Sequence, residues 1–252
     1  LPMPSRRQRQ MCIRDSITGL QTKTLTPDNV NRNYLVYIPD SYDSEIDYPL
    51  MFVFHGFGGI ATQFINSADM RDLAESNNFI VVYPQGLDLG GTGSHWNCSN
   101  PSADNKSDVD DIGFIENLID QLIVDYPVID SKRIYAAGYS NGGFMSYYLA
   151  CNSKKFAAIG SVAGTMLDDS YQSCNASFPT AMINIHGTDD FDVPYDGNIY
   201  YPSIPEVVDW WKNFNTTPNE DLLTNQDGSI EQYKYYNDAG DIYVEHIKII
   251  GG

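Results

Sequence analysis

A serine between two glycines has the surroundings that best suit nucleophilic chemistry: Ser140, in the stretch GYSNGGF at residues 138–144. In a G-x-S-x-G pattern the serine occupies a sharp turn between a strand and a helix, and small flanking residues let neighbouring backbone pass close to it. An apolar run at 133–140 and a helix-like segment at 141–152 supply that context. At a helix N-terminus, backbone N–H groups and the helix dipole favour developing negative charge. The pattern predicts that Ser140 is a nucleophile, with a structural turn serine as the alternative.

Acyl transfer through such a serine also needs an oxyanion hole, which is a pair of preorganised donors facing the tetrahedral intermediate. The backbone N–H of Asn141, directly after the serine, is the expected first donor. The glycine-rich HGFGG at residues 55–59 follows an earlier apolar run and allows close approach of the backbone. The N–H of Phe57 is therefore the expected second donor, and a flexible turn is the alternative interpretation of HGFGG.

The acid of a catalytic triad is expected after a strand that follows the serine. The stretch MINIHGTDDFDVPY, at residues 182–195, offers the carboxylates of Asp189, Asp190 and Asp192. Chain order selects this loop, but it does not select one of the three residues, and at least two of them must be ordinary solvated carboxylates.

The histidine that should accept the serine proton is harder to find. His55 and His186 each precede a glycine at the end of an expected strand, where a histidine that binds loop backbone is the better interpretation. His95 precedes Ser140, which is the wrong chain order for this kind of site. His246 follows the acid loop but lies in the middle of IYVEHIKII, and a base must come within about 2.6–3.2 Å of the nucleophile. No histidine is well placed as the base.

Short apolar runs alternate with amphipathic segments, which is typical of an α/β fold with a mostly parallel sheet and helices on both faces. Strands are expected at 33–39, 48–56, 79–86, 133–140, 156–164 and 180–187. A hairpin of 229–237 and 241–250 is expected to follow, with its second strand closing the sheet. Helices are expected at 67–78, 112–127, 141–152 and 203–215. Ser67 is expected to cap the first of these helices and Ser203 the last.

A long segment at 86–111 is rich in glycine, serine, asparagine and aspartate and has no period. Loops of this length inside a compact domain are usually functional or disordered, and Trp96 with its neighbour His95 favours a loop that contacts substrate. The acidic stretch DVDD at 108–111 lacks the glycine and the ligand spacing of a calcium loop. Because acidic residues stabilise the start of a helix, capping is expected there and a metal site is not.

The first sixteen residues do not resemble the rest of the chain. The stretch LPMPSRRQRQMCIRDS has four arginines and no helical or strand period, and MCIRDS resembles the translation of an adapter end used in sequencing-library preparation. Residues 1–16 are therefore expected to be non-native and are excluded from the fold. A disordered basic arm is the alternative. Residues 17–252 are expected to form a single catalytic domain without internal repeats.

Composition excludes several classes of protein. The 15 basic and 33 acidic residues give a net charge of −18, which argues against a nucleic-acid partner. No apolar run approaches the roughly 20 residues that cross a bilayer, so no membrane span is expected. No CxxC pair occurs, and neither a metal site nor a cofactor is expected. Cys151 and Cys174 could form a disulfide or could remain separate small apolar residues.

Five motifs carry a resemblance to a known family: HGFGG, DVDDIGF, GYSNGGFMSYYLAC, FAAIGSVAG and IHGTDDFDVPY. In this order they resemble the extracellular polyhydroxybutyrate-depolymerase-like and feruloyl-esterase-like α/β-hydrolases. The resemblance covers the chain from about Asn33 to Gly252. It implies the α/β-hydrolase fold, Ser140 as nucleophile and secretion as the usual location. The family pattern HGTxDxxVPY also implies Asp190 as the triad acid, and the family's cysteines imply a disulfide between Cys151 and Cys174.

The resemblance also implies where the base should lie. In the family a histidine follows the last strand in a GGGH-x-WP type of sequence, whereas this chain reads IKIIGG and stops at Gly252. We therefore expect a domain that lacks its last loop and helix, with the histidine one to three residues beyond Gly252. The chain as it stands is expected to be nearly inactive, because triad knockouts keep only a small part of their catalysis.

The sequence therefore predicts a secreted, monomeric serine carboxylesterase that acts through an acyl-enzyme on an ester-bearing polysaccharide or polyester. Feruloyl and acetyl esters of plant polysaccharides are favoured over polyhydroxyalkanoate by the resemblance alone. A peptidase on the same fold is a weaker alternative. A non-catalytic relative that binds polysaccharide or polymer is the alternative from another class.

Overall fold

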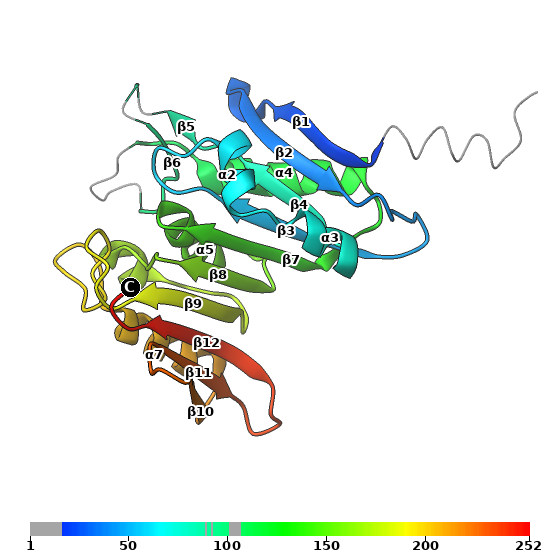
Figure 1. Cartoon of the computed structure of the whole chain (residues 1–252). Helices are drawn as coiled ribbons and strands as arrows, with labels where there is room; N and C mark the ends of the chain where they lie inside the picture. Colours follow the sequence, from blue (N-terminus) through cyan, green and yellow to red (C-terminus); the bar gives the residue numbers. More distant parts are fainter. Residues whose placement is uncertain (1–16, 89, 92, 101–106) are drawn as a thin grey trace, which may run out of the picture.

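Ten strands form one mixed sheet in the computed structural model, which describes residues 17–88, 90–91, 93–100 and 107–252 (Figure 1). The strands are β1 (Gly19–Leu25), β2 (Arg32–Ile38), β3 (Tyr48–Phe54), β4 (Ile80–Pro84), β7 (Ile129–Tyr139), β8 (Ala158–Val162), β9 (Ala181–Gly187), β10 (Asn219–Thr224), β11 (Ile230–Tyr236) and β12 (Ile242–Ile249). Their order across the sheet is β1-β2-β4-β3-β7-β8-β9-β12-β11-β10. The six central strands, from β4 to β12, pair in parallel, and two strands at each edge pair antiparallel. The predicted α/β architecture with a mostly parallel sheet is confirmed.

Helices cover both faces of this sheet (Figure 1). They are α2 (Ala61–Ser67), α3 (Arg71–Asn77), α4 (Asp111–Asp125), α5 (Asn141–Asn152), α6 (Asp168–Ser173) and α7 (Ile204–Asn215). A 3₁₀ turn, η1 (Pro27–Asn29), and a small two-stranded ribbon of β5 (Leu87–Asp88) and β6 (Ser94–His95) complete the described elements. None of the described helices has the length and apolar character needed to span a membrane.

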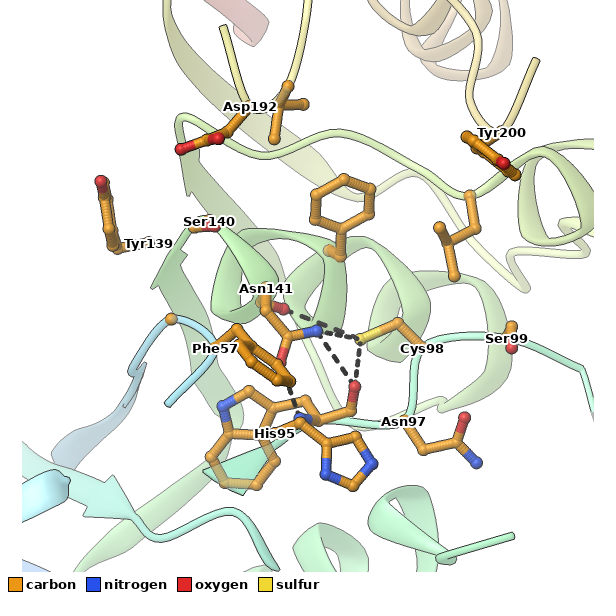
Figure 2. Close-up of a pocket in the computed structure, with 15 residues that line it drawn as sticks. Phe57, His95, Asn97, Cys98, Ser99, Tyr139, Ser140, Asn141, Asp192 and Tyr200 are labelled. Carbon is orange, nitrogen blue, oxygen red and sulfur yellow. Dashed lines mark hydrogen bonds between the residues drawn. The ribbon is translucent and has the colours of Figure 1, made fainter. Parts of the chain in front are cut away.

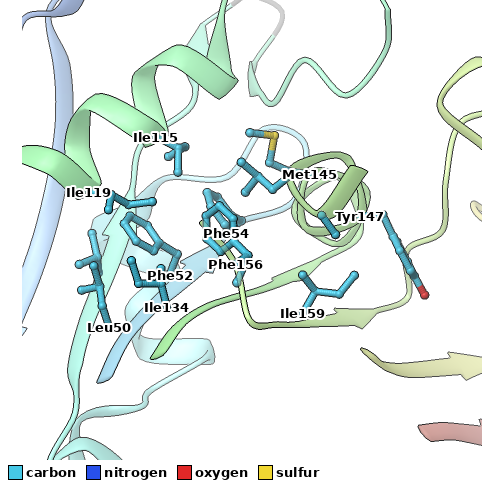
Figure 3. Packing of buried hydrophobic residues seen from close by; sticks show 14 of the residues in the cluster. Leu50, Phe52, Phe54, Ile115, Ile119, Ile134, Met145, Tyr147, Phe156 and Ile159 are labelled. Carbon is cyan, nitrogen blue, oxygen red and sulfur yellow. The ribbon is translucent and has the colours of Figure 1, made fainter. Parts of the chain in front are cut away.

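Buried hydrophobic residues form two clusters, one on each face of the sheet. The alternating direction of the side chains along the central strand β3 explains why there are two. Leu50, Phe52 and Phe54 point to the face covered by α4, α5 and α7, whereas Val53 joins the smaller cluster under α2 and α3. Successive side chains of a strand point to opposite faces, so a strand buried on both sides reads as a continuous apolar run. On the larger side, Phe52 packs edge-on against Phe156 with ring centroids 6.1 Å apart (Figure 3).

The prediction of one helix at 67–78 is wrong. Two short helices occupy this region, and Ser67 ends α2 instead of capping a single helix. The Tyr83 hydroxyl explains the break, because it donates to the Ala68 carbonyl (2.8 Å) and accepts from the Met70 N–H (2.9 Å). A buried tyrosine on β4 thus takes over the backbone groups that a continuous helix would have used.

The hairpin at the end of the chain was only half predicted. Strands β11 and β12 pair antiparallel as expected, but β12 lies between β9 and β11 and does not close the sheet. The edge strand is β10, which follows α7 and was missed. Its residues, NEDLLT, are almost all exposed and do not alternate, so they lack the signal of a half-buried strand. The capping box of Ser203 and Glu206 at the start of α7 agrees with the expected cap.

A disulfide joins Cys151, near the end of α5, to Cys174, which follows α6. The bridge ties the helix that starts at Ser140 to the segment between β8 and β9. The third cysteine of the described chain, Cys98, is buried, and its thiol donates to the Trp96 carbonyl at 3.3 Å.

Candidate active site

Ser140 sits at the junction of β7 and α5 in a strained backbone conformation. Its φ of 50° and ψ of −119° fall in a region that residues with a Cβ rarely adopt. The flanking glycines make the turn possible, because a Cβ on Gly138 would clash with the backbone of Gly142. A Cβ on Gly142 would clash in turn with the carbonyl of Phe54 on β3. The junction therefore packs directly on the central strand β3 and holds the serine at the C-terminal end of β7.

The serine opens into a cavity of 770 Å³ at the C-terminal ends of the parallel strands. Five of the residues predicted for the site line this cavity together: Phe57, His95, Trp96, Ser140 and Asn141 (Figure 2). Several other lining residues were not predicted from the sequence, including Tyr139, Phe144, Leu167, Val193 and Tyr200. Tyr139 occupies the first variable position of the G-x-S-x-G pattern, but Tyr200 carries no sequence signal. Asp190 is not among the lining residues, whereas its neighbour Asp192 is.

A double hydrogen bond joins the residue after the serine to the loop before α4. The Asn141 carboxamide accepts from the Trp96 N–H (2.7 Å) and donates to the Trp96 carbonyl (3.0 Å). The Trp96 indole N–H then donates to the His55 carbonyl (2.9 Å), at the start of the HGFGG loop. Trp96 is only 2 % exposed, so it offers little surface to a ligand. Its contacts support a positioning role between the two segments that carry the expected oxyanion donors.

His55 and His95 are held by the loops around them. His55 donates from Nδ1 to the Gly56 carbonyl (2.7 Å) and accepts the Gly86 N–H at Nε2 (3.0 Å), as expected for a histidine that binds loop backbone. Burial lowers the pKa of His55 below its ordinary value and so disfavours its charged form. The His95 nitrogens lie 3.1 Å from the Leu87 carbonyl and 2.7 Å from Ser107 Oγ. Both rings are therefore committed to structural bonds.

Among the three candidate acids, Asp190 is the one whose side chain accepts backbone N–H groups of the loop. Its Oδ1 accepts the N–H groups of Asp192 (3.0 Å) and Val193 (2.8 Å), and its Oδ2 lies 3.6 Å from His186 Nε2. The same histidine nitrogen binds the Val193 carbonyl at 2.8 Å. Burial lowers the pKa of His186 and so disfavours a charged ring at this contact. His186 is thus a structural histidine of the acid loop.

His246 lies in the middle of β12 and is 3 % exposed. Its Nε2 is 2.9 Å from the Tyr195 hydroxyl, and its ring packs between those of Tyr195 and Tyr233 at centroid distances of 5.8 and 6.0 Å. It does not line the cavity at Ser140. All four histidines of the chain fall within the described residues, and no hydrogen bond joins any of them to the serine.

The acidic residues at the start of α4 have two different roles. Asp110 caps the helix by accepting the Gly113 N–H at 2.7 Å, as expected for an acidic helix start. Asp111 is instead buried in an ion pair with Arg32 at 2.5 Å. This ion pair was not predicted from the sequence. Asp104, the fourth acid of this region, lies outside the described residues. In the described part of the chain, no three His, Cys, Asp or Glu side chains gather in a way that could hold a metal ion.

The buried His246 predicts an acid-dependent loss of stability. Burial lowers its pKa to about 4, whereas an unfolded histidine titrates near about 6.5. The unfolded chain therefore binds the extra proton first, so the stabilisation is complete above pH 6.5 and is lost as the pH falls towards 4. This linkage amounts to about 3 kcal/mol. Urea unfolding between pH 7 and pH 4 should show a flatter pH dependence for His246→Gln than for the unchanged chain.

Tyr195→Phe is the matched control for this measurement, because it removes the hydrogen bond to Nε2 but keeps the titrating ring. It should lower stability at every pH while leaving the slope in place. Equal slopes for His246→Gln and the unchanged chain would contradict a neutral buried ring at this position.

Comparison with known proteins gives one consistent result. The family described as "Putative esterase" matches residues 28–236. Feruloyl esterase C of Emericella nidulans is 30 % identical over 175 residues, which cover 67 % of this chain and 58 % of that protein. Feruloyl esterase D of Neurospora crassa is 29 % identical over 182 residues, which cover 68 % of this chain and 57 % of that protein. The chain thus spans less than two thirds of the length of these relatives.

Solved structures share the fold at lower identity. An acetyl xylan esterase from Aspergillus awamori superimposes with a TM-score of 0.70 at 17 % identity, covering 93 % of both chains. A feruloyl esterase module from Clostridium thermocellum, complexed with sinapinate, gives a TM-score of 0.59 at 18 % identity and covers 92 % of this chain and 81 % of that one. Both likenesses concern the architecture, in agreement with the predicted α/β-hydrolase fold.

Proposed function

The chain belongs to the "Putative esterase" family of feruloyl-esterase-like α/β-hydrolases, and we propose that it is a carboxylic ester hydrolase that works through an acyl-enzyme on Ser140. One observation carries the proposal. A serine in a strained strand-to-helix turn faces a 770 Å³ cavity that Asn141 and Phe57 also line. A strained backbone persists only where its surroundings over-determine it, and such positions cluster at active sites.

The proposed reaction begins with attack of Ser140 Oγ on the ester carbonyl while a base removes the hydroxyl proton. The N–H groups of Phe57 and Asn141 bind the oxyanion of the tetrahedral intermediate. Collapse of the intermediate releases the alcohol, protonated by the same base, and water then hydrolyses the acyl-enzyme. Asp190, fixed by the Asp192 and Val193 N–H groups, orients that base.

We propose that the base is a histidine outside residues 1–252. This step is supported by the positions of the four histidines in the chain, each of which is engaged elsewhere. It is also supported by the position of Gly252, whose carbonyl accepts the Asp189 N–H at 2.9 Å. A residue that follows Gly252 would therefore emerge beside the acid loop, where a base oriented by Asp190 is needed.

The substrate class we propose is an ester of a plant polysaccharide, feruloyl or acetyl. The names of the relatives and of the solved structures support this choice over a polyhydroxyalkanoate, which none of those named above specifies. The Cys151–Cys174 disulfide supports secretion, because disulfides persist in oxidising compartments. We further propose that residues 17–252 are one catalytic domain that acts as a monomer.

Trapping of the acyl group tests the proposal directly. Because the proposed base lies outside the chain, the chain is incubated with imidazole as a substitute base together with an activated aryl ester or the matching anilide, and intact mass and peptide mapping locate any adduct. We expect a single acyl adduct on Ser140 with the ester, none with the anilide and none on Ser140→Ala. An adduct from the anilide would favour a peptidase. Absence of any adduct, together with retention on polysaccharide, would favour the non-catalytic binding relative.

A further inference from the structure

Three large apolar side chains stand exposed on the loop between β9 and α7: Phe191 at 94 %, Ile199 at 86 % and Tyr200 at 62 %. We call these three residues the loop platform. The platform adjoins the cavity at Ser140, because Tyr200 itself lines the cavity and Phe191 precedes Asp192, which also lines it. In Figure 2, Asp192 and Tyr200 lie on the side of the cavity opposite His95 and Asn97, with Ser140 and Asn141 between them.

Exposure of these side chains is not a consequence of a loose loop. The Tyr201 hydroxyl donates to the Asp192 carbonyl (2.9 Å), and its ring packs edge-on against Phe144 of α5 at 5.7 Å. The Asp168 N–H at the start of α6 donates to the Tyr200 carbonyl (2.9 Å). The backbone beneath the platform is therefore fixed at both ends while its apolar side chains face solvent. Exposed apolar groups on a rigid support are typical of binding sites.

The proposed reaction indicates which part of the substrate would lie against this loop. In the proposed reaction the base that Asp190 orients must protonate the leaving alcohol, so the alcohol departs on the side of the acid loop. The loop platform begins at the residue directly after Asp190. An ester bound at Ser140 would therefore direct its acyl group towards His95 and Asn97, and its alcohol part towards Phe191 and Tyr200.

We propose that the loop platform is a subsite for the neutral polysaccharide to which the ester is attached, an inference that rests on the proposed function for its orientation. Tyrosine and phenylalanine offer rigid flat surfaces for the C–H faces of sugar rings. The exposed carboxylates of Asp192 and Asp196 in the same loop can accept hydrogen bonds from sugar hydroxyl groups. The net charge of −18 opposes binding of an anionic polymer.

Binding of a polymer without esters tests this subsite separately from catalysis. The full chain is titrated with unesterified neutral arabinoxylan by calorimetry and by retention in arabinoxylan gels. The double variant Phe191→Ser/Tyr200→Ser should bind about tenfold more weakly, equivalent to about 1.4 kcal/mol. The matched control is Val124→Ser/Leu223→Ser, which removes two exposed apolar side chains (73 and 55 % exposed) from α4 and β10. The control should bind like the unchanged chain.

Four results would overturn the proposal: no binding of arabinoxylan by the unchanged chain, equal binding by the platform variant, an equal loss in the control, or preferential binding of a polyester film or of polygalacturonate. Thermal melts of both variants establish that they fold. Failure of acyl trapping on Ser140 with platform-dependent arabinoxylan binding intact would contradict the proposed hydrolysis and leave the subsite standing. The two proposals can therefore fail independently.

Discussion

Ester turnover by the 252-residue chain is expected to be on the order of 10⁴- to 10⁶-fold lower than turnover by a form in which a base reaches Ser140, because the proposed mechanism places the base outside this chain and a site without one triad member loses most of its catalysis. The four histidines of the chain each serve another purpose: His55 and His186 bind loop backbone, His95 binds Ser107, and His246 is buried against Tyr195. Only the oxyanion donors and substrate binding would remain to accelerate the reaction.

Added imidazole should restore part of this activity, since it can enter an open cavity and accept the serine proton. Initial rates of 4-nitrophenyl acetate hydrolysis are measured against imidazole concentration. We expect a saturable increase of at least roughly tenfold over the rate that imidazole alone produces, because a positioned base contributes about 10²–10⁴-fold. Ser140→Ala supplies the control, since it keeps the cavity but should show no saturable component.

His246→Gln separates the two possible sources of a base. Its activity with and without imidazole should match that of the unchanged chain, because His246 does not line the cavity at Ser140. A burst of acylation by the unchanged chain without imidazole, abolished in His246→Gln, would contradict an external base and would assign that role to the strand histidine.

The strand-to-helix turn at Ser140 was predictable because its determinants are local. Gly138, Ser140 and Gly142 lie within five residues, and the apolar strand and the helix around them can each be read from a short window. Helix α5 begins and ends where the sequence placed it, at Asn141 and Asn152.

Features that depend on distant residues were not predictable in the same way. The bond pair between Asn141 and Trp96 joins residues 45 positions apart, and a short window does not reveal it. The break between α2 and α3 depends on Tyr83, which lies on the next strand along the chain. Trp96 lines the cavity as expected, but the bond from its indole N–H to the His55 carbonyl, 41 positions away, could not be read from the sequence. Tertiary hydrogen bonds decided each of these outcomes.

The buried ion pair of Arg32 and Asp111 gives the largest expected effect on stability. Their side chains are 2 and 0 % exposed, and Asp111 also accepts the Asn97 N–H at 2.7 Å. Arg32→Met should lower the free energy of unfolding by about 3–5 kcal/mol, because it leaves a buried carboxylate without its cation. Urea unfolding followed by tryptophan fluorescence measures the change.

Two further variants separate loss of the charge pair from loss of packing. Arg133→Met breaks a pair whose side chains are 41 and 28 % exposed, and it should cost less than about 1 kcal/mol. Arg32→Met/Asp111→Leu removes both buried charges and should recover a large part of the stability lost in the single variant. A double variant less stable than Arg32→Met would contradict this account, as would equal costs for the buried and the exposed arginine.

The pH dependence of Arg32→Met gives an independent signature. Burial already raises the pKa of Asp111 above its ordinary value, and Arg32 opposes that rise. Without Arg32 the pKa climbs further, so the folded variant binds a proton in a range where the unfolded chain has lost it. Stability of the variant should therefore fall as the pH rises through that range, and its deficit should be larger at pH 7 than at pH 5. Because Asp111 also holds the backbone of Asn97 beside the cavity, the same substitution should weaken whatever binds there.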